Sequence, residues 1–158
     1  HALVSEHFNP NSVSTITITS RGQALGYVRQ IPEDDIYLYT KQYLQSQIAI
    51  ALAGAVAEEI LLGDSSTGAS NDFEQATNLA RKMIFSGMSV LNVVDKDSLP
   101  SEKLHEVISD ILSEQKSAVK KLLEEKRDTL VLVVDYLMEN ERIDGDKLRE
   151  LLYKSRAA

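Results

Sequence analysis

The feature that most constrains the fold is a single change in the spacing of apolar residues near Thr40. Before it, residues 12–19 alternate β-branched apolar side chains with hydroxyl side chains, a period of two that is typical of a half-buried strand. After it, apolar residues recur every three or four positions, as on one face of a helix. They are Leu44, Ile48, Leu52, Ala55 and Val56. The chain is therefore predicted to be mainly α and helical-bundle-like, with a small β-hairpin or meander near its N-terminus.

The hairpin is predicted from two strands and a turn. Arg21-Gly22 supplies the turn signal, and residues 24–31 have the character of a second strand. The acidic stretch PEDD then ends this strand and leads towards the first long helix.

The ends of the helices that follow are marked by capping residues. Thr40 is a suitable N-cap and Gly63 a suitable stop for the first long helix. Asn71, with Glu74 three residues later, resembles a capping box and predicts a second helix that begins there. That helix is predicted to end near Gly87.

The C-terminal half is predicted to be helical after a connector at residues 89–100. One amphipathic helix follows the connector, another begins at Asp128, and a short last helix falls within IDGDKLRELL. The connector is the best candidate border in the chain. We therefore expect a core at residues 1–88 and a C-terminal helical subregion of the same domain at residues 89–158.

Composition excludes several classes of protein. A chain of 158 residues with 43% hydrophobic content is long and apolar enough for one domain with a real core. The formal net charge of −7 argues against nucleic acid or an anionic membrane surface as the main partner. No apolar stretch approaches the roughly 20 residues of a membrane span, so no membrane segment is predicted. Because there is no cysteine, a metal site would depend on histidine and carboxylate ligands.

The residues alone give only weak candidates for chemistry. His1 and His7 are six positions apart, about 240° around a helix, so they cannot bind one metal from one helix. His105 is predicted to lie at a helix edge among charges. A triad of Ser66, His7 and Asp72 has no nucleophile elbow to support it, and no phosphate loop of the GxxxxGK[ST] type is present. Asp72 itself suits the first turn of a helix, where an acid interacts favourably with the macrodipole.

Several segments together resemble one family. HALV, TITITSRGQALGYV, AGAVAEE, STGASNDFEQAT and GMS occur in the same order as in the peptidase domain of FtsH-type ATP-dependent zinc metalloproteases. The late stretch EEKRDTLVLVVDYLMENERIDGDKLRELL is similar to the C-terminal helices of that family. The resemblance covers nearly the whole chain, and it implies a helical metallopeptidase domain.

The resemblance also implies a zinc site. The family domain opens with an H-E-x-x-H helix, and HALV matches the tail of that motif, so His1 resembles the second zinc histidine. The first histidine and the general-base glutamate are expected upstream of this sequence, which leaves no catalytic residue in the chain itself. Asp72, the acid of SND, resembles the third protein ligand. Glu58 or Glu59, in AGAVAEE, would orient a zinc-binding histidine without contacting the metal itself, although AGA here replaces the family's GGR.

A substrate-binding strand is implied as well. RGQALGYV resembles the strand of the family that pairs with unfolded polypeptides, which points to Gly22, Ala24, Leu25 and Gly26. The alternative is a hairpin with only a structural role.

For the parent protein, the resemblance implies an AAA+ ATPase module on the same chain, and ATP would bind only there. It also implies a homo-hexamer anchored in a membrane, with this domain on the cytoplasmic side in bacteria or inside an organelle. We expect the sequence as it stands to have little peptidase activity and to bind zinc weakly. The segment after Gly87-Met88-Ser89 is shorter than is usual in the family. The alternative function is a non-catalytic helical interaction or assembly module that retains the fold, and the residues upstream of His1 would discriminate between the two.

Overall fold

The computed structural model describes residues 1–18, 26–31 and 38–157. The chain forms two compact units: a first unit of residues 1–35 and 123–158, and a second unit of residues 36–122. The border suggested by the sequence, between residues 88 and 89, falls inside the second unit. Because the positions of the two units relative to one another are not determined, each is described by itself.

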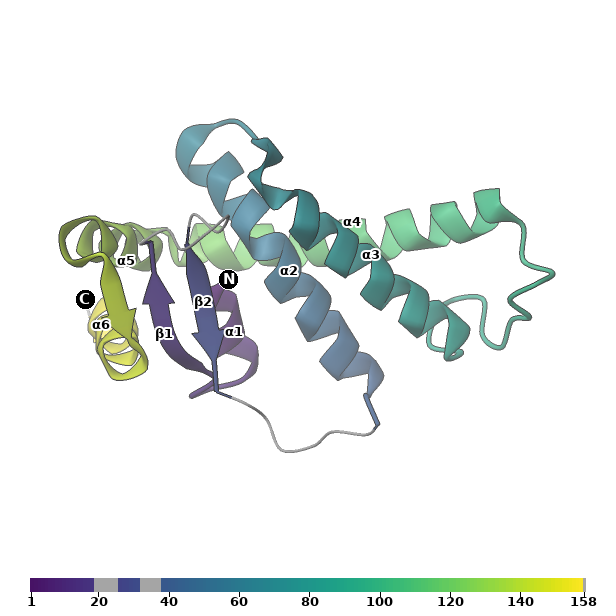
Figure 1. Ribbon diagram of the computed structural model, residues 1–158, viewed down its shortest axis with the longest axis horizontal. Helices are drawn as coiled ribbons and strands as arrows, with labels where there is room; N and C mark the ends of the chain where they lie inside the picture. Colours follow the sequence, from purple (N-terminus) through teal and green to yellow (C-terminus); the bar gives the residue numbers. More distant parts are fainter. Residues whose placement is uncertain (19–25, 32–37, 158) are drawn as a thin grey trace. The chain divides into compact units, whose positions relative to one another are not determined.

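The second unit is helical (Figure 1). It contains α2 (Lys41–Leu62), a short 3-10 helix (Thr67–Ala69), α3 (Ser70–Phe85) and most of α4 (Ser101–Glu125). The predicted ends of α2 are confirmed. The Thr40 Oγ1 atom accepts a hydrogen bond from the Tyr43 N–H at 3.1 Å. Gly63 takes the left-handed conformation with φ 71°, which a residue without a Cβ adopts without strain.

The predicted start of α3 is wrong by one residue, and the predicted capping interaction does not form. The helix begins at Ser70, directly after the 3-10 helix, and no side chain caps it. Asn71 is therefore inside the helix and does not form the predicted capping box with Glu74. Ser66 instead caps the 3-10 helix, because its Oγ atom accepts a hydrogen bond from the Gly68 N–H at 3.2 Å. The helix ends at Phe85, close to the predicted stop.

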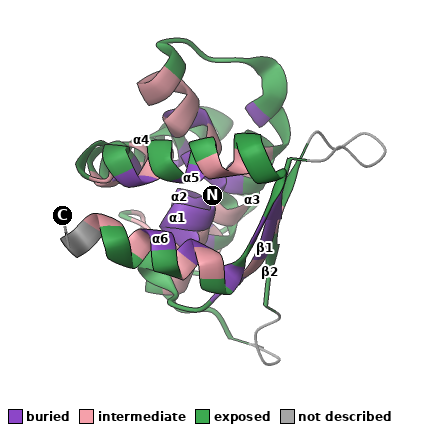
Figure 2. Ribbon diagram, turned by 90° about the vertical axis from the view of Figure 1, so that its left-hand side faces the viewer, coloured by how far each residue is buried: buried purple, intermediate pink, exposed green. Residues whose placement is uncertain are grey.

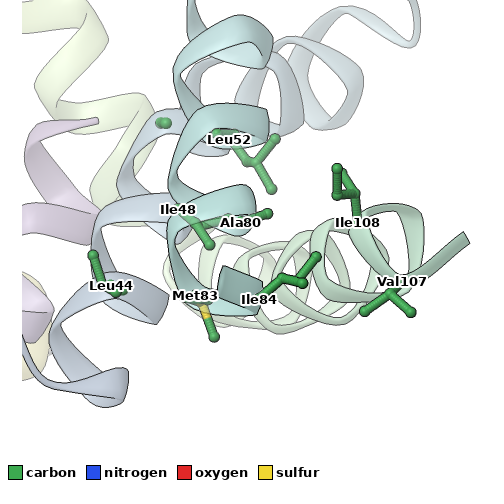
Figure 3. Packing of buried hydrophobic residues seen from close by; sticks show 10 residues of the cluster. Leu44, Ile48, Leu52, Ala80, Met83, Ile84, Val107 and Ile108 are labelled. Carbon is green, nitrogen blue, oxygen red and sulfur yellow. The ribbon is translucent and has the colours of Figure 1, made fainter. Parts of the chain in front are cut away.

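The core of the second unit is a cluster of buried side chains from α2, α3 and α4 (Figure 3). Helix α2 supplies every residue of the predicted periodic stripe, and all of that stripe is buried. The cluster consists of Leu44, Ile48, Ala51, Leu52, Ala76, Ala80, Met83, Ile84, Val107 and Ile108. Apolar burial of this kind is the main favourable term in folding, so the spacing seen in the sequence is what holds this unit together.

Helix α2 is also long and apolar enough to cross a membrane by length and composition, with a mean hydropathy of 1.3 in its most apolar window. No membrane segment was predicted from the sequence, because no apolar stretch approaches the roughly 20 residues of a membrane span. Half of that window is buried inside the protein. A core helix passes the same test, and α2 has the contacts of a core helix.

The first unit is built around a small sheet. It contains α1 (Ala2–Phe8), β1 (Val13–Thr17), β2 (Tyr27–Gln30), α5 (Arg127–Asn140), β3 (Arg142–Asp144) and α6 (Gly145–Ala157). The strand order is β2-β1-β3 and both pairings are antiparallel. The predicted hairpin is confirmed as the β1–β2 pair.

Strand β3 was not predicted. It has only three residues, and its sequence was assigned to the start of the last helix. It pairs with β1 so that Ile143 lies opposite Ile16. Both of these side chains are buried, so a strand from the C-terminal part of the chain makes β1 the central strand of the sheet.

Candidate functional site

His1 stands at the N-terminus of α1. It is the N-cap residue, and its carbonyl oxygen accepts the hydrogen bond of the Ser5 N–H at 2.9 Å. Its side chain is exposed, whereas residues 2–6 behind it are all buried (Figure 2). His1 is thus an exposed residue at the start of a helix whose next five residues are buried.

Asp72 lies in the first turn of α3 and is half-buried. A carboxylate at this place interacts favourably with the free N–H groups of the helix end. The predicted helix-start position of Asp72 is therefore confirmed. This position agrees with the helix-dipole role considered above, and the metal-ligand role stays a prediction.

Glu58 of α2 forms hydrogen bonds with the loop that leads to Asp72. The Glu58 carboxylate accepts hydrogen bonds from the Ser66 Oγ–H at 2.6 Å and from the Ser66 N–H at 3.3 Å. The Ser70 Oγ–H donates to the Thr67 carbonyl oxygen at 2.7 Å. Glu58 therefore holds the residues just before α3, and through them the position at which Asp72 enters the helix.

Glu59, the neighbouring predicted residue, has a different partner. Its carboxylate forms an ion pair with the Lys116 Nζ atom of α4 at 2.7 Å. Neither partner was predicted from the sequence, because the fold of the second unit brings Ser66 and Lys116 to these carboxylates.

The predicted substrate strand is partly visible. Gly22, Ala24 and Leu25 lie outside the described residues. Gly26 immediately precedes β2, and a Cβ added there would come within 2.8 Å of the Thr17 carbonyl oxygen, so glycine permits the close approach of the two backbones. Strand β2 lies at the edge of the sheet (Figure 1). A strand edge of this kind can pair with an extended peptide.

The other two histidines have surface positions. His7 is exposed, and its ring packs edge-on against Phe8 with 5.1 Å between the ring centroids. His105 is exposed on α4 as predicted and lines a pocket of about 620 Å³ between α3 and α4, together with Arg81 and Lys116.

The donor set can be tested against zinc. Within residues 1–18, 26–31 and 38–157, no group of three or more His, Asp or Glu side chains lies together as a metal site. His1 belongs to the first unit and Asp72 to the second. One imidazole and one carboxylate are donor types that zinc accepts, and they account for two of the three protein ligands that a catalytic zinc site uses. The residues present therefore fit zinc in kind, and their pairing stays a prediction.

The family model and the similar proteins that match this chain point to the same family. Residues 1–102 match the model of peptidase family M41. The ATP-dependent zinc metalloprotease FtsH 2 of Thermoanaerobacter sp. (strain X514) is 37% identical over 155 residues, which cover 96% of this chain and 30% of that protein. The ATP-dependent zinc metalloprotease FtsH of Thermus thermophilus is 36% identical over 172 residues, with 96% and 27% covered.

The ATP-dependent zinc metalloprotease FtsH of Bacillus subtilis is 33% identical over 162 residues, which cover 89% of this chain and 25% of that protein. The chain thus spans between 25% and 30% of the length of these three relatives. The matched region includes His1, Asp72 and every other site residue predicted from the sequence. The chain therefore belongs to peptidase family M41, as an FtsH-type peptidase domain.

Proposed function

We propose that this chain is the proteolytic part of a zinc metalloendopeptidase that cleaves unfolded or membrane proteins, and that His1 and Asp72 are two of its zinc ligands. The observation that carries the proposal is the match to peptidase family M41 across the residues that contain both. Their exposure supports it, because His1 is exposed and Asp72 is only half-buried.

The chemistry of these residues follows from their types. The His1 imidazole would donate a nitrogen and the Asp72 carboxylate an oxygen to the metal. When bound, zinc would supply Lewis-acid activation of water for attack on a peptide carbonyl. Glu58, through Ser66, would keep the start of α3 in place, so that the Asp72 carboxylate does not have to be ordered when the metal binds.

The sheet would bind the substrate. In the described sheet β2 is an edge strand, and its outer edge would offer backbone groups to an extended chain, a main-chain pairing that selects shape more than sequence. This property suits an enzyme that acts on many unfolded polypeptides. We propose Gly26 as part of this strand, together with Gly22, Ala24 and Leu25.

The whole protein is proposed from the relatives, whose names describe ATP-dependent enzymes. We propose that the parent chain carries an AAA+ ATPase module that unfolds substrates and is the place where ATP binds. We further propose a homo-hexamer anchored in a membrane, with this domain on the cytoplasmic side in bacteria or in an organelle interior.

The test compares two chains. One is the sequence as it stands, and the other carries an added helical turn followed by His-Glu-Ala-Gly before His1, which restores the motif. We expect zinc-dependent cleavage of casein only by the longer chain, and an activity lower by about 10²–10⁴-fold when the added glutamate is glutamine, because a general base typically contributes that much.

The same test can fail clearly. If the longer chain folds and leaves casein intact with or without zinc, the proteolytic function is wrong, and the non-catalytic interaction module becomes the better reading. Equal cleavage by both chains would show that the upstream motif is not the source of the chemistry.

A further inference from the structure

One buried carboxylate in the first unit has a role that neither the family match nor the sequence motifs assign. The Glu6 side chain, in the C-terminal half of α1, is only 5% exposed. Its two oxygens accept hydrogen bonds from the Val13 N–H at 2.8 Å and from the Asn11 N–H at 3.0 Å. Glu6 therefore ties helix α1 to the loop and strand that follow it.

The third partner comes from the C-terminal helix. The Arg149 Nη1 atom of α6 donates to the Glu6 Oε1 atom at 3.1 Å and to the Val13 carbonyl oxygen at 3.2 Å. Its other terminal nitrogen pairs with Asp146 at 3.1 Å. Arg149 thus contacts both the Glu6 side chain of α1 and the Val13 backbone of β1, so α1, β1 and α6 meet at one ion pair.

The approach of α6 to β1 is unusually close at this place. A Cβ added to Gly145, the first residue of α6, would lie 2.1 Å from the Val13 carbonyl oxygen. No side chain larger than hydrogen fits there without movement of the backbone. The position of α6, and with it the reach of Arg149, is therefore set by direct backbone contact with β1.

Helix α1 depends on such contacts for its orientation. Residues 2–6 of this helix are buried, and Glu6 has partners on the following strand and on α6. A buried carboxylate is tolerated because it is paired and hydrogen-bonded, and loss of one partner leaves it uncompensated. Loss of Arg149 would therefore loosen the hold of Glu6 on α1 at the end opposite His1.

From this geometry we infer that Glu6 and Arg149 are positioning residues that hold helix α1 so that His1 is presented to the metal, which makes the C-terminal helix α6 part of the framework of the site. The inference rests on the proposed zinc-ligand role of His1. It adds two residues that touch neither metal nor substrate and act through α1 alone.

The experiment uses the longer chain with the restored motif and the variant Arg149→Met. Amide hydrogen exchange at Ser5 and Asn9, which donate within α1, reports the order of the helix. Zinc titration against a competing chelator reports the site. We expect at least 10-fold faster exchange at these two amides and at least 10-fold weaker zinc binding, with exchange in α2 and α3 unchanged.

Matched variants separate positioning from general loss of structure. Asp146→Asn removes the exposed partner of Arg149 and should change neither readout. Arg149→Lys keeps a charge in reach of Glu6 and should restore zinc affinity in part. If Arg149→Met proves too unstable to measure, Arg149→Lys is compared with Asp146→Asn instead. We then expect faster amide exchange and weaker zinc binding in Arg149→Lys, and no change in either quantity in Asp146→Asn.

Two results would overturn the inference. One is unchanged exchange at Ser5 and Asn9 in the Arg149 variants, and the other is faster exchange with unchanged zinc affinity. Absence of zinc binding by the unaltered longer chain is a different failure, because it refutes the proposed role of His1 and with it the positioning of a ligand, whatever the exchange rates show about α1.

Discussion

The two units of this chain both bury apolar side chains, but they differ in what else their interiors contain. The second unit buries a continuous cluster of Leu, Ile, Met, Val and Ala side chains from three helices. The first unit contains a short sheet and a polar network in which buried Glu6, Ser5 and Ser12 are each hydrogen-bonded. Apolar packing is non-directional and tolerates adjustment, whereas a buried polar network is stabilising only when its members are satisfied. Of the two residues proposed as zinc ligands, His1 belongs to the first unit and Asp72 to the second.

The largest effect is expected from the core of the second unit. Ile84 is fully buried in the cluster, and Ile84→Ala should lower the free energy of unfolding by about 2–5 kcal/mol through lost burial and a residual cavity. Urea denaturation measures it. The control is Val93→Ala, at a residue that is 93% exposed, which should stay within about 0.5 kcal/mol. Equal changes in the free energy of unfolding for the two variants would mean that burial in this cluster does not stabilise the unit.

The next effect tests the close backbone approach in the first unit. Gly145→Ala should cost about 1–3 kcal/mol, because the added methyl group must displace α6 or β1. Tyr153→Ala is the control, because Tyr153 lies on the same helix and is 75% exposed. Thermal unfolding of both variants, followed by circular dichroism, gives the comparison. A Gly145→Ala chain as stable as the control would contradict the packing of α6 on β1.

A smaller effect is expected at the entrance to α2. Thr40→Ala removes the side-chain acceptor of the Tyr43 N–H and should cost about 1 kcal/mol. Thr40→Ser keeps the hydroxyl and should cost much less. The two chemical-denaturation midpoints are compared under the same conditions, and a serine variant as unstable as the alanine variant would show that the hydroxyl cap is not the stabilising feature.

The smallest effect concerns a surface carboxylate. Hydrogen bonds from Lys154 and Lys147 hold the pKa of Glu150 below its ordinary value. A lowered folded pKa stabilises the folded state above the ordinary glutamate pKa of about 4.3 and loses that contribution as the pH falls through the lowered value. An NMR titration should show the lowered pKa, and the double variant Lys147→Met/Lys154→Met should return it towards normal. An unchanged titration in that variant would assign the shift to another cause.

The same contrast explains what could be predicted from the sequence. Helix α2 was predictable with both of its ends, because the spacing of Leu44, Ile48 and Leu52 is a local property of the chain. Strand β3 was not, because Arg142–Asp144 is too short for a pattern and is a strand only through its pairing with β1, which is far away in the sequence. The start of α3 was missed because a 3-10 turn, capped by Ser66, precedes it.

The residues of the candidate site also differ in whether their roles and partners could be predicted from the sequence. His1 and Asp72 were proposed as zinc ligands only through the resemblance of several segments to one family, since its position in the sequence indicated only a helix-dipole role for Asp72. The partners of Glu58 and Glu59 could not be predicted, because Ser66 and Lys116 reach them through the tertiary packing of helices. Arg149 lies at the other end of the chain from Glu6, and no local pattern in the sequence connects the two.

The most direct test of the central claim is zinc titration of the longer chain with the restored motif, alongside Asp72→Ala, His1→Ala and the control Asp64→Ala. Asp64 is an exposed acid in the same loop region. We expect stoichiometric zinc in the unaltered chain and in Asp64→Ala, and a zinc affinity lower by about 100-fold or more in Asp72→Ala and in His1→Ala. Loss of a direct ligand should cost more than the roughly 10–100-fold loss of affinity that follows removal of a residue that only hydrogen-bonds to a ligand. Unchanged affinity in Asp72→Ala would contradict the account and leave Asp72 as a partner of the helix dipole alone.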